Sequence, residues 1–201
     1  GLTRKSGNRA VWTGRLRLDE QALGAPARWR KPRRVFVNSM SDLFHEAVPG
    51  EFIARVWDAM RCSPQHTFQI LTKRPERMRE VTCGLPLLRN VWLGTSVENA
   101  AALGRIESLR QVRAEIRFVS FEPLLGSVAG VDLTNIDWAI VGGESGPRAR
   151  AMDPVWVDEI ADRCAASGTA FFFKQWGGVN KKATGRTYRD RVWDALPDLR
   201  M

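Results

Sequence analysis

The chain has 201 residues, which suits one domain with enough length to bury a core. Its 31 Lys and Arg against 22 Asp and Glu give a net charge of +9, which favours anionic partners, nucleic acid included. No apolar run approaches the length of a membrane helix, and residues 1–5 lack the apolar core of a signal peptide. We therefore expect a cytoplasmic protein that does not enter a membrane.

The three cysteines, Cys62, Cys83 and Cys164, are far apart in the sequence and form no close pair. Neither a zinc site nor a CxxC redox motif has such spacing, so the sequence predicts no metal site. An odd number of cysteines without a secretory signal is typical of proteins in a reducing compartment. We expect Cys62 and Cys164 to be small core residues on helices, and the isolated His45 and His66 to be surface or capping residues.

Residues 1–34 form a basic N-terminal segment without strong periodicity, and the initial Gly suggests a cut or processed N-terminus. The segment ends in five cations and one tryptophan between Arg28 and Arg34. Such a stretch could bind phosphates, with Trp29 stacking on a base. Alternatively, it could be a solvent-exposed basic segment that leads into the first strand.

From residue 35 to 176, short apolar runs alternate with amphipathic stretches. The runs are rich in β-branched and aromatic residues, as strands buried on both faces are. They are residues 35–37, 67–71, 91–93, 116–119, 138–141 and 170–173. Helical patterns lie between them at 52–60, 75–82, 100–113 and 153–168, whereas 124–136 has little helical signal.

This alternation predicts βα units and a parallel sheet. An open doubly wound sheet and a partial, open TIM-like barrel of about six strands both fit. The residues after the first strand, 38–42, contain no glycine-rich dinucleotide loop, which favours the barrel. The C-terminal tail, 177–201, is expected to be mostly irregular.

Polar and charged residues follow every predicted strand. In parallel βα folds, function gathers at the carboxyl ends of the strands, so these residues should meet at one mouth. Facing acids and lysines perturb one another's pKa, as acid–base sites require. The candidate catalytic residues are Asp42, Lys73, Glu98, Glu122, Glu144 and Lys174.

A second group of residues at the strand exits could contact a small-molecule or anionic ligand. Glycines at a strand exit allow close approach of a ligand to the backbone, although a tight turn would also require them. Solvated loops are the alternative interpretation for each single residue. The candidate cofactor-binding residues are Asn38, Ser96, Asn99, Gly142, Gly143 and Trp176.

Six segments together resemble one family, the uncharacterised phage-borne and bacterial gp-thirty-seven/gp-sixty-eight family. No segment is specific alone, but together they cover most of residues 28–178. They are FVNSMSDLFHE (36–46), LTKRPERM (71–78), VWLGTSVEN (91–99), FEPL (121–124), VGGESG (141–146) and FFKQWGG (172–178).

The resemblance implies a partial βα barrel similar to that of radical S-adenosylmethionine enzymes. Similar proteins carry an N-terminal stretch with three cysteines, which implies an iron–sulfur cluster with S-adenosylmethionine at the barrel mouth. This chain has no cysteine before Val35, and we expect the strand that would precede the cluster loop to be missing as well. We therefore expect these cofactors only if a missing N-terminal segment exists, and a truncated or inactive protein as the chain stands.

Three functions remain open from the sequence. The first is a radical-type barrel enzyme completed by an upstream segment. The second is a nucleic-acid-binding accessory protein of a phage or mobile element. The third is a degenerate barrel with a structural or regulatory role. A barrel lacking its first strand would expose a sheet edge, through which the chain could form a homodimer.

Overall fold

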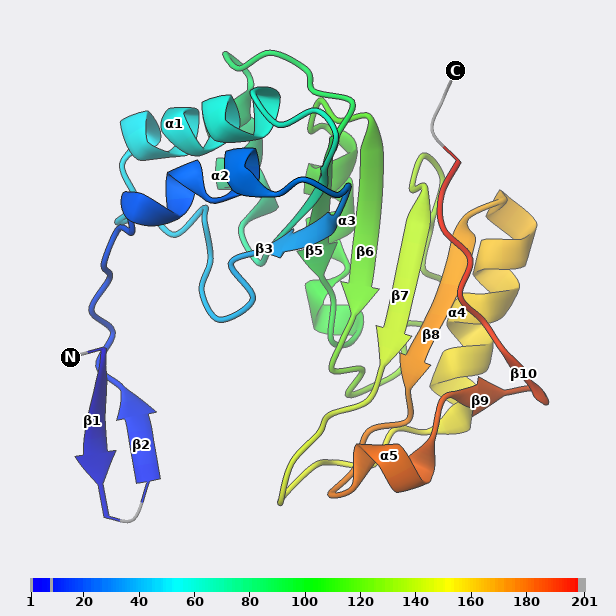
Figure 1. Cartoon of the computed structure of the whole chain (residues 1–201). Coiled ribbons are helices and arrows are strands. Elements are labelled where there is room, and N and C mark those ends of the chain that lie inside the picture. The colour runs from blue at the N-terminus through cyan, green and yellow to red at the C-terminus, as the bar shows by residue number, and fades with distance from the viewer. Residues whose placement is uncertain (1, 8, 199–201) are drawn as a thin grey trace.

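A parallel six-stranded sheet forms the centre of the computed structural model, which describes residues 2–7 and 9–198 (Figure 1). The strands follow one another in chain order across the sheet, and each neighbouring pair is parallel. They are β3 (Arg34–Val37), β4 (Thr67–Thr72), β5 (Val91–Ser96), β6 (Ile116–Phe121), β7 (Trp138–Gly142) and β8 (Ala170–Gln175). All six predicted strands are thus confirmed.

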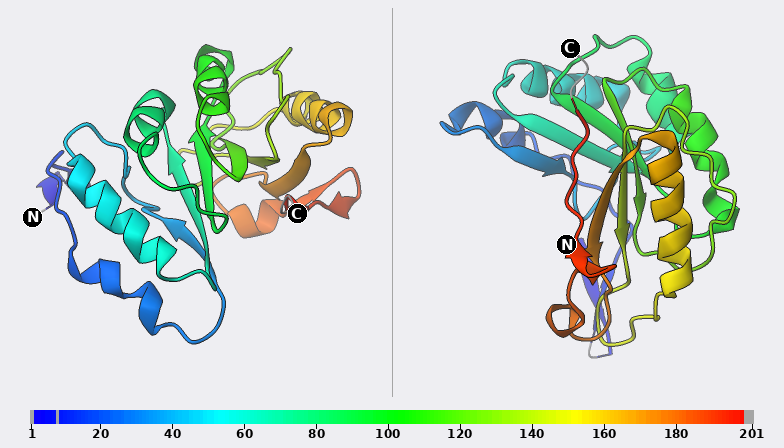
Figure 2. Two further views of the ribbon diagram at one scale, coloured as in Figure 1. Left: turned by 90° about the horizontal axis from the view of Figure 1, so that it is seen from above. Right: turned by 90° about the vertical axis from the view of Figure 1, so that its right-hand side faces the viewer.

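The sheet curls into a half-barrel with the helices on its outer side (Figure 2). Four helices follow strands: α1 (Gly50–Arg61), α2 (Pro75–Thr82), α3 (Gly104–Arg110) and α4 (Pro154–Ser167). The chain between β6 and β7 contains no helix, as predicted. Asp153 caps α4 by accepting a bond from the Val155 N–H, and Gly168 ends it in the left-handed conformation. The fold is therefore the predicted α/β partial barrel.

Alternation along the strands gives the sheet two different faces. Phe121, Val141 and Phe173 belong to the main core, which α1–α4 cover from outside. Trp92, Phe118, Trp138 and Phe172 belong to a second apolar cluster on the concave face. There the Trp138 ring lies 5.7–5.9 Å from the rings of its three aromatic neighbours, so the half-barrel has an aromatic floor.

Gly94 shows how tightly this aromatic floor is packed. A Cβ atom at this position would lie 2.5 Å from the Phe118 ring, which is closer than carbon atoms can approach. The ring therefore rests directly on the backbone of β5, which only glycine permits.

The N-terminal segment contains short elements that the sequence did not indicate. An antiparallel hairpin, β1 (Thr3–Ser6) with β2 (Arg9–Trp12), extends away from the sheet (Figure 1). Two 3-10 turns follow, η1 (Gln21–Gly24) and η2 (Pro26–Arg28), and Glu20 beside them pairs with Arg55 of α1. The segment between the hairpin and β3 therefore packs along α1.

Over residues 177–198, the C-terminal tail is irregular except for α5 (Lys181–Thr184), β9 (Thr187–Tyr188) and β10 (Arg191–Val192). It continues along β8, where the Phe173 N–H donates to the Trp193 carbonyl over 2.9 Å. The tail therefore covers the outer edge of β8. Within the described part of the chain, no helix has the length and apolar character that crossing a bilayer requires.

Candidate ligand site at the rim of the half-barrel

The carboxyl ends of all six strands lie at one rim, because the strands are parallel. Backbone hydrogen bonds tie the loops at this rim together. The Leu125 N–H donates to the Glu98 carbonyl, the Leu124 N–H to the Gly142 carbonyl, and the Gly143 N–H to the Gln175 carbonyl, over 2.8, 2.9 and 3.0 Å. The exits of β5 to β8 are thus held in fixed positions relative to one another.

Polar side chains form a layer between the aromatic floor and the rim. Ser120 lies two residues after Phe118 on β6, and Lys174 lies two residues after Phe172 on β8, so both share the concave face with those rings. Ser96 is the register partner of Ser120 on the neighbouring strand. The concave surface therefore changes from apolar to polar toward the strand ends.

The first charge cluster joins the exits of β4 and β5. The Glu98 carboxylate forms ion pairs with Lys73 and, over 3.0 Å, with Arg105 of α3, which also donates to the Ser96 carbonyl. Burial by itself would raise the pKa of Glu98, but the hydrogen bonds and charges of Lys73 and Arg105 together hold it below its ordinary value. Glu98 is therefore anionic near neutral pH, with two cations around it.

The second charge cluster joins the exits of β6 and β8. The Lys174 ammonium lies 2.9 Å from both oxygens of the Glu122 carboxylate and so reaches across β7. Gly142 of β7 makes this possible, since a Cβ atom there would press on the Glu122 carboxylate at 3.3 Å. A cavity of about 280 Å³ adjoins the pair, lined by Glu122, Pro123, Gly143, Glu144, Ser145, Lys174 and Gln175.

Asp42 belongs to a separate cluster. Its carboxylate accepts bonds from the Thr72 hydroxyl at 2.8 Å, the Phe44 N–H at 2.9 Å and Arg74 at 2.8 Å. Thr72 is a buried residue of β4. It lies two residues after core residue Ile70, so its side chain faces the helix-covered side of the sheet. Asp42 thus fixes the loop after β3. Its carboxylate also accepts a bond from the Lys73 main-chain N–H over 3.5 Å, so this cluster adjoins the first one through the backbone of Lys73. 

Glu144 lies on the loop after β7 and pairs with a cation of the same loop. The Arg150 guanidinium donates two bonds to its carboxylate, at 2.9 and 3.0 Å, and the Arg150 N–H donates a third at 2.9 Å. These hydrogen bonds lower the pKa of Glu144 to about 2. Glu144 lines the rim cavity together with Glu122 and Lys174, but its ion-pair partner is Arg150 of its own loop.

We predict that Arg150→Ala raises the pKa of Glu144 toward the ordinary 4.5. Because the folded pKa is depressed, the pairing stabilises the loop fully above about pH 4.5 and is lost as the pH falls toward 2. An NMR titration of the Glu144 carboxyl carbon measures both proteins. An unchanged midpoint in Arg150→Ala would show that another group holds the carboxylate ionised.

Gly143 and Gly177 mark a crossing of two backbones. A Cβ atom on Gly143 would lie 2.0 Å from the Trp176 carbonyl oxygen, and one on Gly177 would lie 2.3 Å from the Glu144 carbonyl oxygen. Gly177 also has a φ of +83°, in the region that favours glycine. The glycines therefore let the exits of β7 and β8 touch each other.

The other candidate ligand-contacting residues lie in different surroundings. The Trp176 indole packs against Phe173 and Tyr188 and donates to the Thr187 carbonyl over 2.8 Å. Asn99 caps the 3-10 turn η3 (Ala100–Ala102) by accepting a bond from the Ala101 N–H. Asn38 has a φ of +59° and lines a different cavity, beside β3. Among this group, Ser96, Gly142 and Gly143 adjoin the two charge clusters or the rim cavity.

Two arginines of the charge clusters were missed by the sequence analysis. Arg105 comes from α3 and Arg150 from a long loop, so neither follows a strand directly. No pattern in the sequence indicates their positions. Their effect is to neutralise Glu98 and Glu144, which leaves Glu122 and Lys174 as the pair most closely associated with the rim cavity.

The cysteines lie away from the rim. Cys62 and Cys83 follow the C-terminal ends of α1 and α2, where the chain returns toward the starts of the next strands, and both are exposed. Our expectation of a buried Cys62 was therefore wrong, whereas Cys164 is buried as expected. Burial raises the pKa of the Cys164 thiol to about 12. Among the residues that the structure describes, no group of three or more His, Cys, Asp or Glu could hold a metal ion.

A family model matches residues 2–197, nearly the whole chain. Its description is "Protein of unknown function (DUF5131)". The chain belongs to this family. The DUF5131 description carries no reaction, ligand or origin. No curated protein and no solved structure matches the chain.

Proposed function

We propose that the rim of this DUF5131 protein binds a small ligand carrying both charges, with S-adenosylmethionine as the leading candidate. The observation that supports the proposal is the Glu122–Lys174 pair beside a cavity of about 280 Å³. Lys174 shares the concave face of β8 with Phe172 of the aromatic floor. A zwitterionic amino-acid group can exchange its ammonium and carboxylate for the two partners of such a pair. S-adenosylmethionine is also what the resemblance to radical barrel enzymes implies.

The residues of the concave face fit the parts of this ligand. Glu122 would accept from the ammonium and Lys174 would donate to the carboxylate. Half-buried Phe172 of the aromatic floor, with half-buried Leu71 and Ile140 packed beside it, would receive the adenosyl group. When bound, S-adenosylmethionine supplies an activated sulfonium group next to the rim.

The iron–sulfur cluster implied by the same resemblance does not fit the cysteines of this chain. A cluster needs thiolates that converge on one point. Cys62 and Cys83 end different helices, and the thiol of buried Cys164 stays protonated because its pKa is raised. We therefore propose ligand binding at the rim without a cluster held by these three cysteines.

Calorimetric titration with S-adenosylmethionine tests the proposal. We expect saturable binding by the intact chain and at least about tenfold weaker binding by Lys174→Met, since a charged hydrogen bond contributes about 1.5–3 kcal/mol. Lys31→Met removes the same charge from an exposed site in the basic segment and should bind like the original protein. No binding, or equal weakening by both variants, would contradict the proposal.

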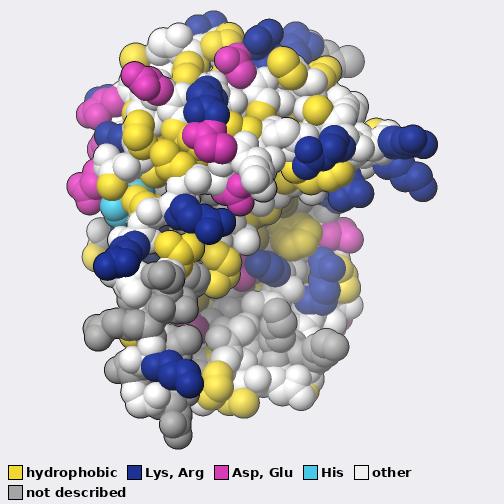
Figure 3. All heavy atoms as spheres, turned by 60° about the vertical axis from the view of Figure 1, so that its left-hand side comes forward, with side chains coloured by type: hydrophobic (Ala, Val, Ile, Leu, Met, Phe, Trp, Pro, Cys, Tyr) yellow, Lys and Arg dark blue, Asp and Glu magenta, His cyan; other side chains and the backbone are white. Residues whose placement is uncertain are grey.

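A second candidate function, nucleic-acid binding, is favoured by the basic segment before β3. Arg28, Arg30, Lys31, Arg33 and Arg34 are all exposed, and Lys and Arg side chains gather on the right-hand side of the face in Figure 3. Trp29, however, is half-buried, with the Arg33 guanidinium 4.9 Å from its ring centre and His66 packed edge-on. Phosphate contacts are thus better supported than base stacking.

A salt titration of DNA binding tests this second candidate. If the five cations contact phosphates, the logarithm of the binding constant should fall with the logarithm of salt concentration, with a slope of about −0.9 per contact on duplex DNA. Replacing Arg30 and Lys31 by Gln should make that slope less steep by the contribution of about two phosphate contacts. A flat salt dependence, or an unchanged slope in the variant, would exclude this segment as the binding surface.

A further inference from the structure

Strand β3 forms a free edge of the sheet. It is the last strand on its side and pairs only with β4. The Thr67 N–H donates to the Arg33 carbonyl, so in this parallel ladder Val35 and Val37 direct their main-chain groups at β4. Arg34 and Phe36 therefore direct theirs outward. Within residues 2–7 and 9–198, no backbone hydrogen bond is recorded on this outer side.

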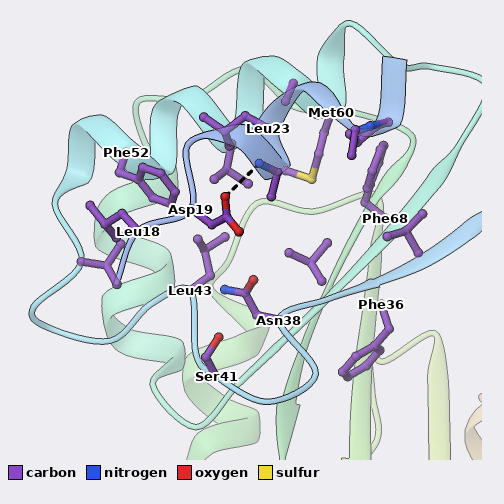
Figure 4. Close-up of a pocket in the computed structure, with 18 of the residues that line it drawn as sticks. Leu18, Asp19, Leu23, Phe36, Asn38, Ser41, Leu43, Phe52, Met60 and Phe68 are labelled. Carbon is purple, nitrogen blue, oxygen red and sulfur yellow. Dashed lines mark hydrogen bonds between the residues drawn. The ribbon is translucent and has the colours of Figure 1, made fainter. Parts of the chain in front are cut away.

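A cavity of about 450 Å³ runs along this edge, between β3, α1 and residues 16–29 (Figure 4). The cavity is lined by Val35 and Val37 from one face of β3 and by Phe36 from the other face. The cavity therefore lies beside the strand. Its walls are mainly apolar. They include Leu18, Leu23, Phe52, Met60 and Phe68.

The space therefore borders both unpaired main-chain groups and an apolar wall. Phe36 is 43% exposed although it is a large apolar residue in a strand. A small apolar ligand would fill the cavity but leave the main-chain groups of Arg34 and Phe36 unpaired. An added β-strand would pair the main-chain groups and fill the cavity at once, because its backbone bonds to the edge and its alternate side chains enter the cavity.

The charges around this edge favour an acidic partner. Four exposed cations lie at or just before β3: Arg30, Lys31, Arg33 and Arg34. The cavity itself is lined by Arg17, Asp19 and Asp42, and the two carboxylates accept bonds from the Ala22 N–H and from Arg74. A second copy pairing through β3 would bring two of these basic segments together, and like charges at an interface are unfavourable. A segment with acidic residues at its ends would complement them.

We propose that the outer edge of β3 is a strand-addition site. Its occupant is an extended peptide segment with apolar side chains at alternate positions and acidic residues at its ends. It pairs with the main chain of Arg34 and Phe36 and places its apolar side chains in the cavity. This site is separate from the cavity beside Glu122 and Lys174 and does not depend on S-adenosylmethionine binding.

Amide hydrogen exchange of the full chain tests the proposal with a synthetic peptide of about ten residues, a typical upper length for a strand. The peptide alternates Val or Leu with Thr and ends in Glu, and a scrambled peptide of the same composition is the control. We expect the alternating peptide to slow exchange of the Phe36 amide at least about tenfold. Equal protection by both peptides would overturn the proposal. Protection without peptide that rises with protein concentration would also overturn it, because it would indicate a second copy on the edge.

Two substitutions at Phe36 separate the backbone contribution from the side chain. Phe36→Ala keeps the outward N–H, whereas Phe36→Pro lacks it, and an edge strand tolerates proline when its N–H faces outward. We expect the Ala variant to bind the peptide and the Pro variant to bind at least about tenfold more weakly. Equal affinities would overturn the pairing.

A third substitution tests the cavity without changing β3. Ala59 of α1 lines the cavity, so Ala59→Phe should raise the melting temperature by filling it and should also weaken peptide binding. Unchanged peptide affinity in a folded Ala59→Phe protein would overturn the proposed insertion of side chains. This variant keeps the test decisive if Phe36→Pro does not fold.

Discussion

Gly143→Ala is expected to lower the free energy of unfolding by about 3 kcal/mol, because its new methyl group would meet backbone atoms that cannot simply rotate away. The added Cβ would lie 2.0 Å from the Trp176 carbonyl oxygen and 2.7 Å from its carbonyl carbon. Relief of this contact requires the exits of β7 and β8 to move apart. Urea denaturation measures the loss.

Gly104→Ala is the matched control. Gly104 begins α3, has an ordinary φ and has no atom within 4 Å of an added Cβ. Alanine there should leave stability unchanged or raise it by up to about 1 kcal/mol. If both variants were equally stable, the two exits would not be in contact, and the fixed rim described above would be wrong.

Gly143→Ala should also affect the ligand site. The Gly143 N–H donates to the Gln175 carbonyl, and Gln175 follows Lys174 directly. Separation of the two exits would therefore shift Lys174 relative to Glu122. Gly143 and Gly177 thus support the site through backbone packing. From the sequence we had expected ligand approach or a tight turn as the reason for Gly142 and Gly143.

The sheet was predictable because its determinants are local. Each strand is a short run of β-branched or aromatic residues, and each long helix shows its own apolar stripe, so the order and type of the elements follow from the sequence. Asp153 and Gly168 likewise marked the ends of α4 by their own conformational preferences. The parallel arrangement then places all strand exits at one rim.

The pairing of charges at that rim was not predictable, because it depends on contacts between distant residues. Lys174 meets Glu122 over a strand in which Gly142 leaves room, and Arg105 reaches Glu98 from a helix. His66 is another example. We expected it at the surface or in a cap, but it is buried, and its ring accepts from the Arg33 N–H over 3.2 Å.

Exchange of the two charges at the rim should abolish ligand binding while preserving the fold. In the double variant Glu122→Lys/Lys174→Glu, the ion pair remains, and a partly exposed pair contributes only about 0–1 kcal/mol, so stability should change little. The adenosyl group, held by the apolar residues, fixes the direction of the amino-acid group. Its ammonium would then face Lys and its carboxylate would face Glu.

Calorimetry of this double variant with S-adenosylmethionine tests the central claim most directly. We predict binding at least about 100-fold weaker than that of the original chain, the loss expected from two unfavourable charge contacts. The melting temperature of the variant should stay close to that of the original. A folded double variant that binds S-adenosylmethionine as tightly as the original chain would show that Glu122 and Lys174 do not form the ligand site.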